Sequence, residues 1–389
     1  MSQVSRLATC PTRSLAIKHY FCTLRDPRRR HRRLHRLLDI VAIAICAVIC
    51  GADNWQQIAT FGQRRRTWLQ RFLALPHGIP SHDTFERVFE RLDPAAFQAC
   101  FRSWVAALCV RGEMPHIAID GKTLRRSGSR NLGPLHMVSA WATAHHLVLG
   151  QEAVAEASNE ITAIPRLLEL LDLAGALVTI DAIGCQKDIA CQIVAQGGDY
   201  VLTVKDNQAT LHADLQQVFD EALSQEGTPL RERSLRTRDR NHGRTESRDY
   251  YVLAVPAAFA ERHGEWAGLR SLGLVLSERQ VGEREPSYEA RFFISSLPPR
   301  VRAFARAVRN HWGIENSLHW HLDVTFGEDT SRIRQRRSAE NFALLRRLAL
   351  SLLKQHPAKT SVACKRLAAA LDTDFLEEIL QPTGNSEKP

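Results

Sequence analysis

Two acidic residues stand where apolar strand sequences end. The stretch HIAIDGKTLR, residues 116–125, leads β-forming residues into Asp120 and then Gly121, and LVTIDAIGCQKDIA, residues 177–190, does the same with Asp181. A carboxylate at the end of a buried strand is costly to desolvate unless something compensates its charge. Either residue could instead be an ordinary turn or capping residue.

A third acid lies in the helical sequence VRAFARAVRNHWGIENSLHWHLDV, residues 301–324. Its apolar stripe runs through Val301, Phe304, Val308, Trp312, Leu318 and Leu322. The helical period puts Glu315 in the same stripe, so we expect Glu315 to face the core, where a lone charge is costly. The alternative is a buried ion pair, for which Arg309 is available.

Three converging carboxylates repel one another unless cations share them. Carboxylate oxygens with open positions suit Mg²⁺ or Mn²⁺, which also bind water and substrate phosphate. Two such ions can activate a water or a 3′-hydroxyl and stabilise the leaving oxygen in phosphodiester transfer. The pattern therefore predicts that Asp120, Asp181 and Glu315 are catalytic and hold Mg²⁺ or Mn²⁺, two ions per active site.

The charge of the chain is unevenly distributed. The net charge is +10 over 389 residues, and residues 1–100 alone hold 16 Lys and Arg against 7 Asp and Glu, a net +9. The segment RDPRRRHRRLHR, residues 25–36, contributes most of this excess. Such asymmetry is typical of a polyanion binder, and the alternative is a solvated basic surface.

Helical spacing and short turns continue to about residue 110, which predicts a helical, basic DNA-binding domain at 1–110. The most apolar run, residues 37–50, is too short to span a membrane and is expected to be a buried helix. The nine cysteines form no CxxC pair. We interpret them as reduced thiols of a cytoplasmic protein without a membrane partner.

Beyond residue 115, strands alternate with helices, which predicts an α/β fold with a mixed sheet covered by helices. We expect a catalytic core at 111–225, a β-rich insertion at 226–300, the second part of the core with the Glu helix at 301–380, and a disordered tail at 381–389. In the insertion, arginines at period two around an Asn-His-Gly turn, residues 236–248, predict a charged hairpin. It could hold DNA or be a solvated face.

Five motifs occur together in this order: IDGKTLRRS (119–127), TIDAIGCQKDIA (179–190), YVLTVKDNQ (200–208), HGRTESR (242–248) and RNHWGIENSLHWHLDVTFGED (309–329). With them, nearly the whole chain resembles the DDE insertion-sequence transposases, in the branch that includes the H-repeat-associated proteins. The resemblance implies an RNase H-like core interrupted by a β-rich insertion, with Asp120, Asp181 and Glu315 as the metal-binding triad. It also implies cleavage at the ends of an element, followed by attack of the freed 3′-hydroxyl on target DNA.

The partners implied are double-stranded DNA, as terminal inverted repeats and target, and further copies of the chain in a homodimer or higher multimer. Related transposases place Tyr, Arg and Lys around the Glu, whereas this helix has no lysine nearby, so other side chains must contact phosphate. The candidates for DNA contact are Arg28, Arg29, Arg30, Arg32, Arg33, Arg64, Arg65, Arg66, Lys122, Arg125, Lys205, Arg244, Arg309, His311, Asn316 and Arg332.

Two rival functions share this sequence pattern. One is an inactive or domesticated relative that binds DNA without cutting, against which the three intact acids argue. The other is an RNase H-fold nuclease that hydrolyses DNA and never joins strands, which fold alone would not distinguish.

Overall fold

A computed structural model describes residues 16–108, 115–129, 132–224, 234–241 and 243–381, without the side chains of Ala16, Arg32 and Asn241. The chain divides into two compact units. One unit comprises residues 1–110, 124–134 and 321–389 and is helical; the other comprises residues 111–123 and 135–320 and contains the sheet.

Nine strands in the described part of the chain form one sheet, in the order β3-β2-β1-β4-β5-β9-β8-β7-β6. The strands are β1 (His116–Leu124), β2 (Leu135–Ala142), β3 (Leu147–Ala153), β4 (Leu177–Ile180), β5 (Asp199–Val204), β6 (Leu235–Asn241), β7 (Arg244–Ala254), β8 (Ser271–Val281) and β9 (Ser287–Ser295). β1, β4 and β5 are parallel to one another, whereas β2 and β3 pair antiparallel. The predicted mixed sheet is confirmed.

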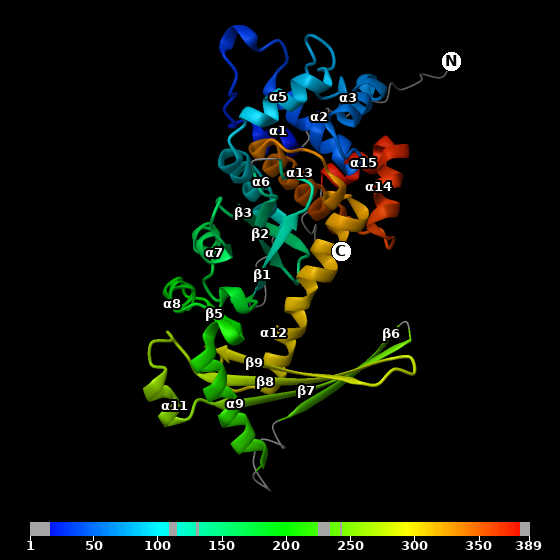
Figure 1. Cartoon of the computed structure of the whole chain (residues 1–389). Coiled ribbons are helices and arrows are strands. Elements are labelled where there is room, and N and C mark those ends of the chain that lie inside the picture. The colour runs from blue at the N-terminus through cyan, green and yellow to red at the C-terminus, as the bar shows by residue number, and fades with distance from the viewer. Residues whose placement is uncertain (1–15, 109–114, 130–131, 225–233, 242, 382–389) are drawn as a thin grey trace, which may run out of the picture. The chain divides into compact units, whose positions relative to one another are not determined.

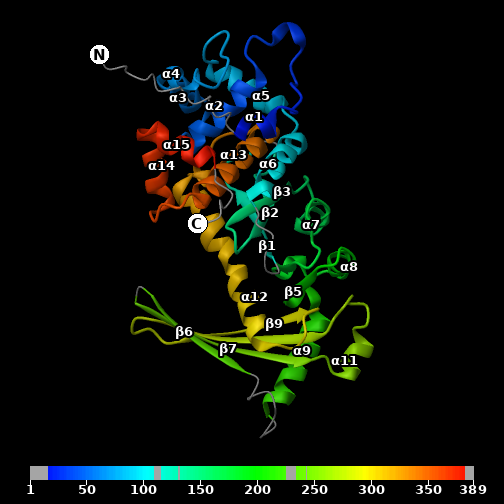
Figure 2. The same ribbon diagram turned by 180° about the vertical axis from the view of Figure 1, so that it is seen from behind.

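Helices cover both faces of this sheet (Figures 1 and 2). The helices are α7 (Glu160–Glu169), α8 (Lys187–Ala195), α9 (Ala209–Ser224), α11 (Ala257–Arg262) and α12 (Val301–Ile314). Residues of α7, α8, α9 and α11 share one apolar cluster with Ile119, Ile180 and Leu202 of the sheet. Phe304 and Val308 of α12 pack with strand residues of the opposite face in a second cluster. Alternate strand residues thus face the two helical layers, as the period of two requires.

The β-rich insertion extends the same sheet and does not form a separate one. β9 pairs antiparallel with β5, and β8, β7 and β6 follow in turn. The hairpin expected around residue 242 is β6–β7, but its register pairs Asp239 with Glu246 and Arg238 with Ser247. Opposed residues share a face, so the arginines at 236, 238 and 240 lie on the face opposite to Arg244 and Arg248. Both faces of this hairpin therefore carry charged side chains.

The helical unit is built around two helices with few exposed residues, α2 (Leu37–Ile49) and α13 (Arg336–Gln355). Around them lie α1 (Ala16–Phe21), α3 (Trp55–Arg64), α4 (Arg66–Leu69), α5 (His82–Arg91), α6 (Pro94–Leu108), α14 (Val362–Leu371) and α15 (Thr373–Leu380). The buried Asp39 of α2 accepts a hydrogen bond from the Leu75 N–H at 3.0 Å. This bond explains how an apolar helix holds a carboxylate.

The division into units differs from the domain boundaries expected from sequence. Residues 301–320 group with the sheet, whereas residues from His321 onward group with the N-terminal helices. The functional division into domains stays a prediction. The expected disordered tail lies, apart from Gln381, outside the described residues. None of the described helices combines the length and apolar character that a membrane span needs, and the seven described cysteines are free thiols.

Candidate active site

Asp181 follows the last residue of β4, as expected, whereas Asp120 lies inside β1, which continues to Leu124, so the expectation that a strand ends at Asp120 was wrong. The parallel pairing of β1 with β4 stops at Ile119 and Ile180, and each aspartate is the next residue on its strand or chain. Asp120 Oδ1 accepts a hydrogen bond from the Gly121 N–H at 2.9 Å, and its Oδ2 lies 3.4 Å from His319 Nδ1. The two carboxylates therefore lie beside each other beyond the carboxyl end of β4, where open α/β sheets place functional groups.

Asp181 begins the 3₁₀ turn Ala182–Gly184, but its side chain makes no capping hydrogen bond. Its Oδ1 is buried and has no hydrogen-bond partner within the described part of the chain. An orphaned buried acceptor is costly. The backbone N–H groups of Ile183 and Gly184 nevertheless lower the pKa of Asp181, so the turn stabilises part of its charge while Oδ1 stays without a partner.

Glu315 begins a π-helical turn, Glu315–His319, at the end of α12. The side chain is exposed and does not face the core, so our expectation of a core-facing Glu315 was wrong. Ile314, Leu318 and Leu322 are buried instead, so the apolar stripe passes through Ile314, the residue before Glu315. The alternative of an ion pair with Arg309 also fails, since Arg309 pairs with Asp239 at 3.0 Å.

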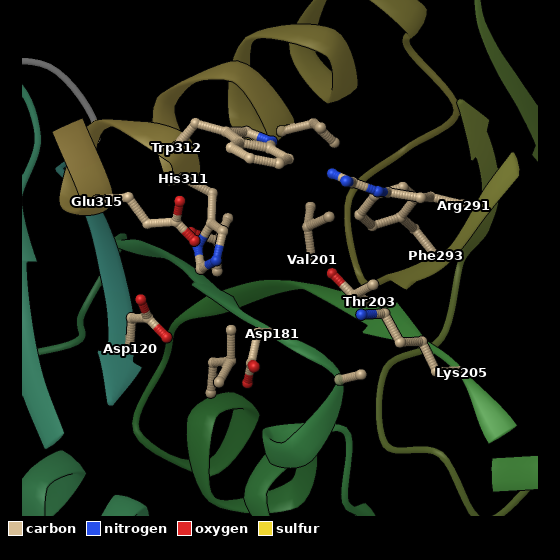
Figure 3. A pocket seen from close by; sticks show the side chains of 14 residues that line it. Asp120, Asp181, Val201, Thr203, Lys205, Arg291, Phe293, His311, Trp312 and Glu315 are labelled. Carbon is tan, nitrogen blue, oxygen red and sulfur yellow. The ribbon is translucent and has the colours of Figure 1, made fainter. Parts of the chain in front are cut away.

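All three acids line one cavity of about 220 Å³ (Figure 3). Glu315 approaches from the helix above, whereas Asp120 approaches from β1 and Asp181 from the end of β4 below. The remaining lining residues are Thr179, Ile180, Ala182, Val201, Thr203, Lys205, Arg291, Phe293, Val308, His311 and Trp312. The cavity is lined by carboxylates and by cationic and aromatic side chains. Such a lining suits a substrate that carries both phosphate groups and aromatic bases.

The charges of this cavity are poorly compensated. Burial, and then the neighbouring charges of Asp181, Glu160 and Glu315, raise the pKa of Asp120 to about 8. Burial and the charge of Glu160 also raise the pKa of Asp181, while the backbone N–H of Ile183, the charge of Lys205 and the N–H of Gly184 lower it. Burial and neighbouring acids are the causes expected where carboxylates share a partly buried site.

Glu160 is the acid that the sequence analysis missed. It is the first residue of α7, after the N-cap Asn159, and its Oε1 lies 2.6 Å from His136 Nε2. His136 Nδ1 is in turn 2.7 Å from Thr123 Oγ1. Because a carboxylate only accepts, His136 Nε2 donates to Glu160 and Nδ1 accepts from the threonine. In the sequence, Glu160 could be recognised only as an acidic residue in the first turn of a helix, which is ordinary.

Gly121 makes room for this fourth acid. A Cβ at Gly121 would lie 2.1 Å from Glu160 Oε1 and 2.6 Å from His136 Nε2. Both distances are far shorter than any van der Waals contact, so no other residue fits without moving these side chains. The glycine after Asp120 thus has a steric reason that the sequence alone did not show.

The residues present suit a divalent metal ion in their chemistry. Every anionic donor is a carboxylate, Asp181 Oδ1 has no hydrogen-bond partner among the described residues, and burial together with the neighbouring acids raises the pKa of Asp120. Hard oxygen ligands of this kind match Mg²⁺ and Mn²⁺. As the side chains stand, however, no three His, Cys, Asp or Glu residues within the described ranges are grouped as ligands of one ion.

Two histidines share one threonine at the cavity: His311 lines the cavity from α12, and His116 is buried in β1. His311 Nδ1 and His116 Nε2 are each 3.0 Å from Thr179 Oγ1. Burial lowers the pKa of both imidazoles to about 4, so both are neutral at pH 7. His311 was predicted to contact phosphate, and a neutral ring can do so as a hydrogen-bond donor but adds no charge.

The other predicted DNA contacts fall into groups. The exposed ones are Arg29, Arg30, Arg33, Arg64, Arg66, Arg125, Lys205, Arg244, Arg309, Asn316 and Arg332. Arg125 pairs with Asp329 at 3.1 Å, and the half-buried Arg65 donates to the Ala370 carbonyl. The side chain of Arg32 lies outside those described.

Two of the residues predicted to contact DNA are buried, and their contact with DNA stays a prediction. Arg28 is 7% exposed and donates to Asp26 and to the His35 carbonyl, so it holds its own loop together. Lys122 is 8% exposed. A DNA phosphate cannot reach such side chains without a rearrangement, because they are buried. The sequence shows which residues are charged but not which of them are buried.

The strand order β3-β2-β1-β4-β5, with β1, β4 and β5 parallel, makes the sheet unit an RNase H-like α/β core. The chain belongs to the DDE transposase family, because the family model described as "Transposase DDE domain" matches residues 111–352. A second model, described as "DDE_Tnp_1-associated", matches residues 18–105. The family resemblance found in the sequence motifs is confirmed.

Curated relatives agree with this assignment. The chain is 40% identical to "H repeat-associated putative transposase YhhI" of Escherichia coli strain K12, over 93% of this chain and 96% of the relative. It is 42% identical to "Putative transposase YncI" of Escherichia coli O157:H7, over 93% of each. The solved cryo-EM structure of a piggyBac transposase synaptic complex with hairpin DNA aligns at 10% identity and a TM-score of 0.41, over 95% of this chain and 78% of that one.

Proposed function

We propose that this chain is a metal-dependent DNA transposase that cleaves DNA at the ends of its own element and joins the freed ends to target DNA. The observation that carries the proposal is that Asp120, Asp181 and Glu315 line one cavity, with the pKa values of both aspartates raised. Carboxylates gathered at such a cost in free energy are typical of a site that works with bound cations.

In this proposal, Asp120, Asp181 and Glu315 hold Mg²⁺ or Mn²⁺. Glu160 of α7 adds a fourth negative charge close to the two aspartates. The bound ions would activate a water or a 3′-hydroxyl and stabilise the leaving oxygen. The chain itself orients the substrate. Lys205, at the cavity wall, would bind a phosphate oxygen by its charge, and the neutral His311 would donate a hydrogen bond.

The DNA partner would be bound first by the basic helical region at 1–110, whose exposed arginines include Arg29, Arg30, Arg64 and Arg66. Contacts to phosphates position a protein without reading sequence, so recognition of terminal inverted repeats needs base contacts in addition. Because two ends of an element must be brought together, the working form would be a dimer or higher multimer on DNA.

The test is cleavage by the full chain of DNA that carries the inverted repeats flanking its gene, with Mg²⁺ or Mn²⁺. We expect cleavage and strand joining by the wild type, and Asp181→Asn should abolish both while DNA binding persists, because the substitution removes a metal ligand but no cation. Unchanged cleavage by Asp181→Asn would remove this residue from the mechanism. Cleavage without any joining would favour the nuclease alternative.

A further inference from the structure

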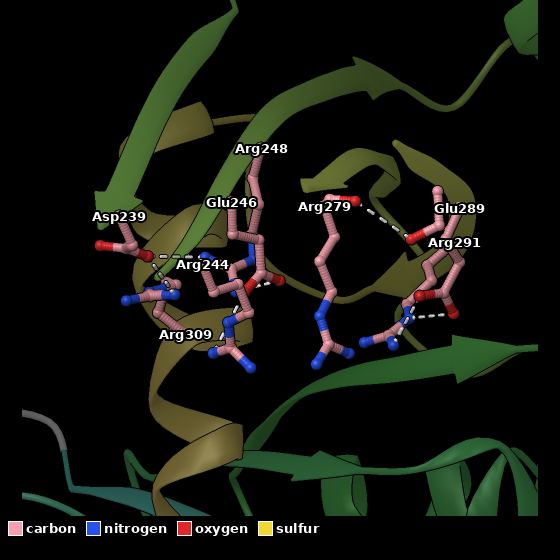
Figure 4. A network of polar contacts seen from close by, with 9 residues as sticks. Asp239, Arg244, Glu246, Arg248, Arg279, Glu289, Arg291 and Arg309 are labelled. Carbon is pink, nitrogen blue, oxygen red and sulfur yellow. Dashed lines mark hydrogen bonds and ion pairs between the residues drawn. The ribbon is translucent and has the colours of Figure 1, made fainter. Parts of the chain in front are cut away.

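A second cavity, of about 440 Å³, lies beside the first and shares Arg291, Trp312 and Glu315 with it. Its other lining residues are Asp239, Arg244, Glu246, Arg248, Ser277, Arg279, Ser287, Glu289, Arg309 and Asn316. We call it the arginine pocket (Figure 4). Five of its residues are arginines, contributed by β7, β8, β9 and α12.

The strand register explains why these side chains meet. Asp239 pairs with Glu246, Glu246 pairs with Arg279, and Arg279 pairs with Ser287, so one row crosses four strands on one face. Residues two apart along each strand share that face, which adds Arg248 and Arg291. α12 lies against the same strands, and its Arg309 reaches Asp239.

Most of these arginines are held by carboxylates. Asp239 Oδ2 is 2.7 Å from Arg248 Nη1 and 3.0 Å from Arg309 Nη1. Glu289 binds Arg291 through both oxygens, at 2.7 and 2.8 Å. Figure 4 shows these pairs across the open centre of the pocket.

Glu246 binds Arg248 and lies 3.5 Å from Arg244. The guanidinium of Arg279, in contrast, makes no hydrogen bond or ion pair within the part of the chain that the structure describes. The pocket is lined by five arginines and, with Glu315 included, by four carboxylates, so its net charge is close to zero.

The geometry points to a phosphodiester-binding site whose carboxylates occupy the phosphate positions until DNA displaces them. A carboxylate presents two oxygens to a guanidinium with the same spacing and planarity that make arginine a good partner for phosphate. We propose that the DNA strand continuing from the acid cavity places its phosphates here, on Arg309, Arg291 and Arg279. The proposal rests on the proposed function and adds a second part to its substrate site.

Exposure supports an exchangeable contact. The Arg309–Asp239 pair is 43% and 41% exposed, and ion pairs between exposed groups contribute little net stability. A phosphate can therefore replace Asp239 at small cost. Asp239 also pairs with Arg248, which is only 15% exposed and keeps its second partner Glu246 when Asp239 is displaced, so Arg248 is expected to stay in place.

The competing explanation is that Asp239 is a structural tie that holds α12, and thus Glu315, to β6. The two explanations predict opposite effects of Asp239→Asn. A structural tie, once removed, weakens DNA binding because the site loosens. A displaced competitor, once removed, strengthens DNA binding because a repulsive charge next to the phosphate is gone.

The test measures the affinity of the full chain for a fluorescein-labelled 20-base-pair DNA duplex of arbitrary sequence, by anisotropy in EDTA at several salt concentrations. We expect Asp239→Asn to lower Kd about threefold to tenfold, since removing one nearby like charge is worth about 1 kcal/mol. The salt slope should stay unchanged, because the bound state keeps the same phosphate contacts. Arg309→Gln should raise Kd and reduce the slope by about 0.9.

Glu152→Gln is the matched control, because Glu152 pairs with Arg166 at 2.8 Å outside the pocket and the substitution changes net charge equally. It should leave Kd unchanged. Glu289→Gln, which frees Arg291 on the other side of the pocket, should tighten binding as Asp239→Asn does and keeps the test decisive if Asp239→Asn fails to fold.

Tighter binding by the folded pocket variants, but not by Glu152→Gln, supports the proposal. Binding that is weaker, unchanged or matched by the control overturns it while wild-type DNA binding, and with it the proposed function, still stands. A wild-type chain that does not bind the duplex would instead count against the proposed function itself.

Discussion

Asp120→Asn is expected to stabilise the metal-free protein while it destroys the proposed active site. The substitution keeps the shape of the side chain and removes one of the clustered negative charges. In the wild type, burial and neighbouring acids raise the pKa of Asp120 from 3.8 to about 8. At about 1.4 kcal/mol per pH unit, this corresponds to an upper limit of about 6 kcal/mol at high pH.

The sign follows from proton binding. Below pH 3.8 the Asp120 carboxyl is protonated in the folded and the unfolded chain, so it costs nothing. Between pH 3.8 and about 8 the unfolded chain releases the proton and the folded chain keeps it, so the free energy of unfolding falls as pH rises. Above pH 8 the loss is complete. The variant has no such group. The free energy of unfolding of the variant therefore exceeds that of the wild type by an amount that grows from pH 4 to pH 8 and is then constant.

The assay is urea denaturation in EDTA at several pH values, for the wild type and Asp120→Asn. We expect the variant to be more stable at pH 8.5 by about 3 kcal/mol, half the upper limit, because water and side-chain movement relieve part of the repulsion. Added Mg²⁺ should stabilise the wild type and should have little effect on the variant. Equal stability of the two proteins from pH 4 to pH 8.5 would refute this account of Asp120.

Two further predictions test the surroundings of the site and the helical unit. Gly121→Ala should lower the free energy of unfolding by about 1–3 kcal/mol, because its Cβ would collide with Glu160; Gly133→Ala, which meets no atom within 4 Å, should be nearly neutral in the same urea titration. Glu328→Gln should cost about 3–5 kcal/mol in thermal or urea unfolding, since it leaves the fully buried Arg347 without its carboxylate at 2.9 Å; a loss below 1 kcal/mol would contradict this.

Periodicity predicted most of the fold, because strands and long amphipathic helices carry strong local patterns. The mixed sheet, the buried helix at 37–49 and the hairpin around residue 242 all follow from such patterns. The pairing of β9 with β5 does not, since no local signal states which strand an insertion will join. The expectation that Glu315 faces the core failed because the adjacent Ile314 takes the buried position, and the helical period alone does not decide between two neighbouring residues.

The sequence by itself determined that two acids follow apolar strand-forming residues, that a third occurs in a late helical segment, and that positive charge gathers in the first 100 residues. These properties depend on residue type and spacing, which sequence states directly. Only the tertiary structure decided that Glu160 lies near Asp120 and Asp181, that Arg28 is buried, and that four of the five pocket arginines are paired with acids. Each of these depends on which surfaces the chain brings together, since burial and charge pairing arise between segments far apart in sequence.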